Sequence, residues 1–101
     1  MSFASDVQAV TKTANAAAVS GRTRIQGIYY TCTGTGSSFD LRNGATDTDT
    51  SLVNIVTPAA AGAYDIILPD NGILFDSGVF FDKADANVTS VTLIFCGGAA
   101  A

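Results

Sequence analysis

Apolar and polar positions along this chain form short runs of the kind that β-strands require. Residues 39–42 alternate between apolar and polar side chains, which predicts a strand with one apolar face and one wet face. Residues 23–32 carry β-branched and aromatic side chains at both odd and even positions, which predicts a strand buried on both faces. In total, strands are expected at residues 23–32, 39–42, 51–57, 64–68, 73–75, 79–82 and 91–95.

Turn sequences separate these runs. Asn43-Gly44 is the strongest dipeptide signal for a tight turn. In the segment from Pro69 to Gly72, proline presets φ and the following Asn-Gly tolerates a positive φ. Short strands at roughly 8–12-residue spacing are typical of a sandwich or a small barrel. The pattern therefore predicts an all-β fold, namely a small antiparallel β-sandwich of seven to eight strands with a jelly-roll-like arrangement.

The two ends of the chain lack this pattern. Residues 4–20 are rich in Ala, Ser and Thr without a clear period, so they fit an extended arm, a weak strand or a short helix. We expect an N-terminal arm at residues 1–20 that contains one strand. The β-sandwich domain then spans residues 21–96, and residues 97–101 form a flexible tail.

The residue types that are missing limit the chemistry. The 101 residues include no His, Glu or Trp, and all nine acidic residues are Asp. The commonest general acid–base residue and the commonest metal ligand are thus absent, so we expect no enzyme activity, no cofactor and no metal site. Only 14% of residues are charged, against roughly 25% in an average globular protein. A chain this poor in charge either covers itself with Ser, Thr, Asn and Gly or hides part of its surface against neighbours, and the second option indicates an assembly.

The net charge of −4 disfavours nucleic acid, whose phosphates bind basic surfaces. Residues 1–42 contain four bases and two acids, whereas residues 43–101 contain one base and seven acids. This asymmetry either attracts copies edge to edge or is ordinary scatter of surface charge. The sequence has no apolar run of about 20 residues and no secretory signal at its start. We therefore expect no membrane span and synthesis in the cytoplasm.

One segment resembles an active-site signature. The run from Leu74 to Gly78 has the hydrophobic-hydrophobic-Asp-Ser-Gly pattern of aspartic proteases, in which two such Asp share a proton. In that family the signature lies early and most of the domain follows it. Here only 23 residues follow Gly78. We therefore interpret Asp76-Ser77-Gly78 as a β-turn.

Three other motifs have structural explanations. Asp47 and Asp49 offer oxygen ligands for Ca²⁺, but an EF-hand loop also needs a distal Glu, so we expect a solvated hairpin loop. Asn87 begins a glycosylation triplet, which is instead the start of a strand if the chain carries no signal peptide. Cys32 and Cys96 lack an activating His and the CxxC spacing of zinc sites. They form a disulfide only if their strand ends meet, and two buried free thiols are the expected state.

The best candidates for partner contact are Arg22, Arg24 and Gln26, which share one face of a strand. Arginine is the preferred interface cation because its fork binds carboxylates bidentately. A docking patch for an acidic partner and a solvated strand end explain this pattern equally well. Three tyrosines are candidate platforms for stacking sugars, although their place in apolar runs favours core or interface packing. They are Tyr29, Tyr30 and Tyr64.

Three segments resemble small virion proteins of tailed bacteriophages, especially marine and cyanobacterial phages. They are Ser20 to Tyr30, Leu68 to Phe75 and Asn87 to Thr92. The resemblance implies a structural virion protein, and the capsid decoration or cement type fits this size. It also implies the major capsid protein as a partner, a homo-oligomer such as a trimer, and an N-terminal arm that orders on the shell. The alternative is a receptor-binding or fibre-tip module of the phage tail.

Overall fold

The computed structural model describes residues 7–101. This range contains eight β-strands and no helix. The strands are β1 (Gln8–Lys12), β2 (Ala16–Cys32), β3 (Ser38–Asn43), β4 (Ser51–Val56), β5 (Gly62–Ile67), β6 (Ile73–Phe75), β7 (Gly78–Lys83) and β8 (Val88–Ala100). Every strand pair in this range is antiparallel. The all-β fold class is therefore confirmed.

The long strand β2 organises the fold, because four other strands pair with it. One of its edges pairs with β8. The other edge pairs with β7 at residues 16–20, with β6 at 23–25 and with β5 at 27–32. Gly21 adopts a φ of 86°, a value that favours glycine, between the part bound to β7 and the rest. Strand β1 extends the sheet beyond β8, and β3 and β4 extend it beyond β7.

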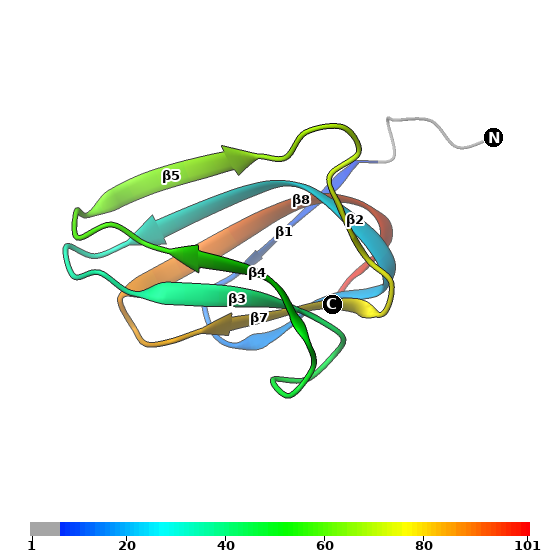
Figure 1. Ribbon diagram of the computed structural model, residues 1–101, viewed down its shortest axis with the longest axis horizontal. Coiled ribbons are helices and arrows are strands. Elements are labelled where there is room, and N and C mark those ends of the chain that lie inside the picture. The colour runs from blue at the N-terminus through cyan, green and yellow to red at the C-terminus, as the bar shows by residue number, and fades with distance from the viewer. Residues whose placement is uncertain (1–6) are drawn as a thin grey trace.

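The eight strands form one continuous sheet that folds over on itself, because the first residues of β2 pair with β7. Its two halves face each other as layers, with β1, β8, β2 and β5 in one and β7, β3 and β4 in the other (Figure 1). Strand β6 belongs to the first layer through its pairing with β2. The Tyr30 ring of β2 meets the Phe39 ring of β3 edge-on, with the centroids 5.4 Å apart. Since β2 and β3 do not pair, this contact crosses from layer to layer and identifies a sandwich. Phe39 in turn packs on Phe81 of β7 at 5.7 Å.

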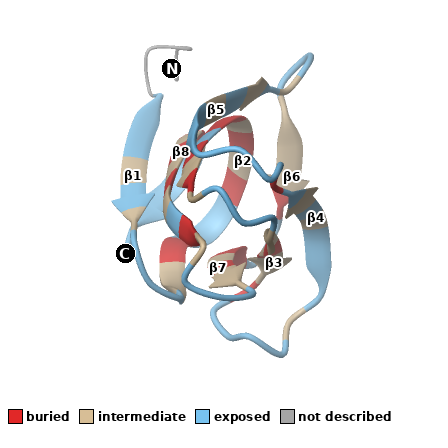
Figure 2. Cartoon of the chain, turned by 90° about the vertical axis from the view of Figure 1, so that its left-hand side faces the viewer, coloured by how far each residue is buried: buried red, intermediate tan, exposed pale blue. Residues whose placement is uncertain are grey.

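The core lies between the layers. Buried segments from both layers turn toward each other, and the outer sides are exposed (Figure 2). The largest buried side chains are Phe39, Phe75, Phe81, Phe95, Ile25, Ile28, Leu41 and Leu93. Apolar residues of this size each contribute about 1.5–3 kcal/mol on burial, so the core accounts for the stability of the sandwich without a metal or a disulfide.

Strand β2 is not buried on both faces, in contrast to our expectation from its sequence. Ala18 and Val19 are both buried at its start, and beyond them the buried side chains are at odd positions as far as Ile25 and at even positions from Ile28 onward. The pairing register with β8 shifts between Ile25 and Gly27, which is a β-bulge at Gln26. Because one extra residue reverses the alternation, apolar side chains of both parities reach the same core.

Both ends of the described chain belong to the sandwich, which differs from the expected arm and tail. Strand β1 pairs with β8 over its whole length, and β2 continues without interruption across the expected domain boundary at residue 20. Residues 97–100 extend β8, and the Ala101 amide donates to the Ala18 carbonyl at 3.0 Å. The strand predicted within the arm is thus present, but it is an integral edge of a layer. Residues 1–6 of the expected arm lie outside the described residues.

Candidate functional site

The side of the β1–β8–β2–β6–β5 layer that points away from the core is the candidate site, and we call it the outer face. In β2, the burial of Thr23 and Ile25 directs Arg22 and Arg24 to this face. Beyond the bulge, the burial of Ile28 and Tyr30 directs Tyr29 and Thr31 to the same side. The outer face therefore has an arginine end and a tyrosine end.

At the arginine end, two of the three predicted contact residues line one hollow. A cavity of about 140 Å³ lies at this end of the outer face. It is lined by Arg22 and Arg24 of β2, by Cys96 of β8 and by Leu74 of β6, among other residues. Cys96 and Leu74 lie on either side of Arg24 in the strand register, so their side chains share its face. Gln26 does not line this cavity, because it is the partly buried extra residue of the bulge.

Neither guanidinium at this end forms an ion pair within residues 7–101, although the charge of Arg22 contributes to the lowered pKa of Asp76. The two ion pairs in that range both involve Arg42. Its Nε lies 2.9 Å from Oδ2 of Asp82, and its Nη2 lies 3.4 Å from Oδ2 of Asp40. Arg22 and Arg24 donate no side-chain hydrogen bond to any of the described residues. Their ten N–H bonds in total, about five for each guanidinium, are therefore open to an outside acceptor.

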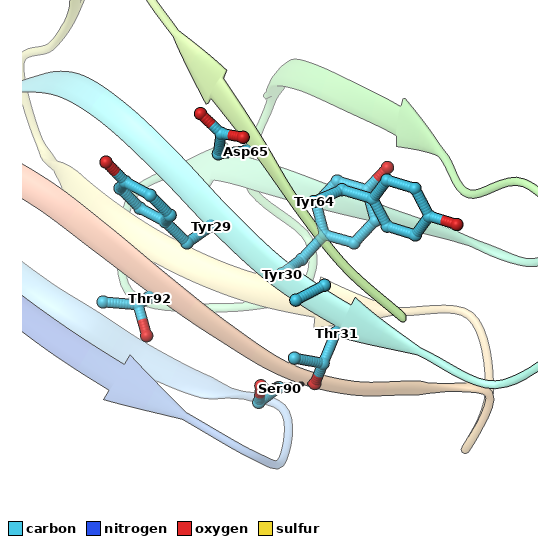
Figure 3. Close-up of a pocket in the computed structure, with 8 residues that line it drawn as sticks. Tyr29, Tyr30, Thr31, Tyr64, Asp65, Ser90 and Thr92 are labelled. Carbon is cyan, nitrogen blue, oxygen red and sulfur yellow. Dashed lines mark hydrogen bonds between the residues drawn. The ribbon is translucent and has the colours of Figure 1, made fainter. Parts of the chain in front are cut away.

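At the tyrosine end, strand register sets two rows of side chains next to one another. Tyr29 lies directly between Asp65 of β5 and Thr92 of β8. Thr31 lies between Ala63 and Ser90 in the same way. Directly paired residues project to the same side of a sheet, so these rows form one continuous surface. Figure 3 shows Tyr29 between Asp65 and Thr92, with Thr31 and Ser90 beside them.

These rows border an open hollow of about 160 Å³, which Tyr30 and Tyr64 also line. Tyr29 is 44% exposed, although it is a large aromatic side chain. A Cβ atom at Gly27 would contact Ile94 at 3.5 Å and the Tyr29 ring at 3.7 Å, so the ring leans along the sheet over this glycine. The Thr31 hydroxyl is 2.6 Å from that of Ser90, and the Thr92 hydroxyl is 2.8 Å from that of Thr11. The result is an aromatic surface bordered by hydroxyls and one carboxylate.

Comparisons with known proteins give one structural likeness. No family model matches the chain, and no curated protein sequence matches it. Among solved structures, the Tobacco streak virus coat protein is similar, with a TM-score of 0.41 and 8% identity over 98% of this chain and 91% of that chain. A likeness at this level does not bear on function, so the function rests on the outer face itself.

Asp76 lies in the exposed turn between β6 and β7, as its sequence predicted. Its carboxylate accepts hydrogen bonds from the Asn43 amide at 2.7 Å and from the Ser77 hydroxyl at 3.1 Å. These bonds hold the pKa of Asp76 below its ordinary value. A protease aspartate must instead share a proton, which requires a raised pKa in one member of the pair. The geometry of Asp76 is therefore that of a turn residue.

The Asp47–Asp49 segment is a loop that Asp49 closes on itself. One Asp49 oxygen accepts hydrogen bonds from the Ala45 and Thr46 amides at 2.9 and 3.0 Å and from the Thr46 hydroxyl at 3.0 Å. The bonds from Thr46 are the main cause of a lowered pKa at Asp49.

Within residues 7–101 no three His, Cys, Asp or Glu side chains are grouped to hold a metal ion. The same range includes no helix long and apolar enough to cross a membrane.

The two cysteines are free thiols, but only Cys32 is buried as expected, since Cys96 is partly exposed. Cys96 pairs with Arg24, and Cys32 lies eight residues further along β2, at the end paired with Val88. Eight strand residues span about 26 Å, whereas the Cα atoms of a disulfide lie within about 7 Å. The fold therefore keeps the two sulfurs apart.

The three candidate tyrosines all line the cavity at the tyrosine end, but Tyr29 is exposed, Tyr64 is partly buried and Tyr30 is buried. Tyr30 is buried and stacks on Tyr64 with ring centroids 5.5 Å apart, and burial raises the pKa of Tyr30. Sequence reasoning did not single out Asp65 or Thr92, which lie beside Tyr29. Alternation along β5 indicated that Asp65 points outward, but only the strand register places it opposite Tyr29.

Proposed function

We propose that this chain is a structural virion protein that binds the outside of a phage capsid as a decoration or cement protein. The resemblance of residues 20–95 to small virion proteins of tailed phages supports this class. The observation that carries the proposal is the arginine end of the outer face, where Arg22 and Arg24 border a cavity without an internal carboxylate partner in the described range. An acidic patch on the major capsid protein is the partner that this geometry fits.

The physical logic of decoration favours a protein of this kind. A shell under outward pressure from its genome is stabilised by any protein that bridges neighbouring subunits. A homo-oligomer such as a trimer would engage several subunits together, and multivalency then strengthens attachment without a tight single contact. Arginines beside apolar residues are typical of such contacts, because the guanidinium binds a carboxylate while its surroundings exclude water.

The test is attachment of the double variant Arg22→Ala, Arg24→Ala to empty capsids in a co-sedimentation assay. Removing an arginine from a desolvated contact costs about 2 kcal/mol or more, so attachment should weaken at least about 30-fold. Circular dichroism should be unchanged, since neither guanidinium bonds to residues 7–101. Attachment of the wild type should also weaken as salt is raised.

A control with the same change in net charge separates a specific contact from general repulsion. Thr35 and Ala59 are exposed loop residues, and Thr35→Asp with Ala59→Asp lowers the net charge by the same two units. This control should attach like the wild type. If the arginine variant also co-sediments like the wild type, the arginine end is not the docking site and the proposal fails.

Location on the particle separates decoration from a receptor-binding or fibre-tip role. Antibody to this chain should label the whole head surface in negative-stain electron microscopy. Label confined to the tail would refute decoration.

A further inference from the structure

We propose that the cavity at the tyrosine end of the outer face binds a neutral pyranose sugar, whose ring stacks on Tyr29 and whose hydroxyls donate to Asp65. This inference does not depend on the proposed function. Four residues lie between Arg24 and Tyr29 along β2, and one of them is the bulge residue Gln26. The β8 partners of Arg24 and Tyr29, Cys96 and Thr92, are four residues apart, which is about 13 Å of strand, so a partner can occupy the arginine end without covering Tyr29.

The first support is the exposure of the Tyr29 ring. Tyr30 and Tyr64 stack on each other and pack in or against the core, whereas Tyr29 does not belong to the core. The absence of a side chain at Gly27 leaves room for the ring to lean along the sheet. The C–H groups on one side of a pyranose form an apolar surface, and such a surface packs well against an aromatic ring.

The second support is the position and freedom of Asp65. This exposed residue is the direct cross-strand neighbour of Tyr29, so its carboxylate borders the ring. It takes part in no salt bridge with the described residues. A carboxylate accepts hydrogen bonds only, through two oxygens, and adjacent sugar hydroxyls present two donors at matching separation.

The third support is the wall of the cavity. Thr31, Ser90 and Thr92 supply hydroxyls that both donate and accept, which suits a ligand made of hydroxyls. The volume of about 160 Å³ is below the roughly 300–1,000 Å³ of pockets for drug-sized ligands, so it accommodates one sugar ring. Asp65 is the one charged side chain that lines it, and its charge disfavours acidic sugars.

The experiment is a titration of the ¹⁵N-labelled full chain with methyl glycosides of galactose, glucose, mannose and N-acetylglucosamine, followed by amide chemical shifts. At least one sugar should bind with a dissociation constant of about 1–10 mM, the range for so small a ligand at a single site. The shifts should concentrate at residues 29–31, 63–65 and 90–92. N-acetylneuraminic acid should bind at least about tenfold more weakly than the best neutral sugar.

Three variants test the assigned roles. Tyr29→Ala should weaken binding about tenfold or more, whereas Tyr29→Phe keeps the ring and should stay within about twofold. Asp65→Asn should weaken neutral sugars and reduce the discrimination against the acidic sugar. Val56→Ala is the matched control, since Val56 is 73% exposed on β4 and does not line the cavity.

Two outcomes would overturn the inference. One is the absence of localised shifts with all four neutral sugars. The other is equal binding by Tyr29→Ala and the wild type, which would assign the shifts to another surface. The failure of this site and that of the docking site are distinguishable, because Arg22→Ala with Arg24→Ala should keep sugar binding. If Tyr29→Ala abolishes capsid attachment while no sugar binds, the tyrosine end belongs to the protein interface and the sugar site is refuted.

Discussion

Replacing Gly72 with alanine should destabilise the sandwich strongly, although Gly72 lies in an exposed loop. The loop turns tightly between β5 and β6, and the Gly72 amide donates to the Pro69 carbonyl at 3.0 Å. Gly72 has a φ of 76°. An alanine Cβ at this position would overlap the carbonyl oxygen of Ile25 in β2. That oxygen belongs to the backbone of the central strand, so the overlap cannot be relieved by rotating a side chain.

Two costs determine the magnitude. A residue with a Cβ in the left-handed region costs about 1–2 kcal/mol. Forcing an extra methyl group into a packed site costs about 1–3 kcal/mol. Together they lower the free energy of unfolding by about 2–5 kcal/mol, out of the roughly 5–15 kcal/mol typical of a domain. At about 4–8 °C per kcal/mol, the melting temperature should fall by about 10–40 °C.

Urea denaturation monitored by circular dichroism measures this loss, and Gly34→Ala is the matched control. Gly34 is an exposed loop glycine where an added Cβ meets no atom within 4 Å. The control should change stability by less than about 0.5 kcal/mol. If Gly72→Ala unfolds within that margin of the control, the loop does not lie against β2 as described, and the argument from the Ile25 carbonyl is refuted.

Two further predictions concern titration and thiol chemistry. Hydrogen bonds, mainly from Thr46, lower the pKa of Asp49 in the folded state. The ionised carboxylate therefore stabilises the fold at every pH above the unfolded pKa of Asp49. This stabilisation is lost as the pH falls through the folded pKa. Asp49→Asn should therefore be less stable than the wild type at pH 7, and the urea midpoints of the two proteins should converge below about pH 3. A difference between the midpoints that does not change with pH would contradict this prediction. In a thiol-labelling assay the native protein should expose Cys96, which is partly buried, before the buried Cys32, and labelling at equal rates would be inconsistent with the fold.

The sequence by itself determined the class of the fold. Alternation at residues 39–42 and the turn at Pro69 to Gly72 depend on the nearest neighbours in the chain, because strand period and turn geometry are local properties. The missing residue types likewise limited the available chemistry before any coordinate was known. Because Arg22 and Arg24 are two positions apart on one strand, the sequence also placed them on one face, and in the structure they line one cavity.

Long-range pairing decided the rest. Residues 97–100 carry no strand signal, yet they continue β8 because Val19 and Ser20 offer an edge to pair with. The bulge at Gln26 reverses the alternation of β2, and no local rule distinguishes it from a strand buried on both faces.

The candidate sugar site depends most strongly on the tertiary structure. Tyr29, Asp65 and Thr92 come from three strands, and only the hydrogen-bonded register sets them in one row. A shift of one residue in either pairing would turn Asp65 or Thr92 to the other face. Outside the bulge of β2, local sequence therefore determined which side chains point outward from a strand, whereas the sum of contacts over the whole core decided which of them became neighbours.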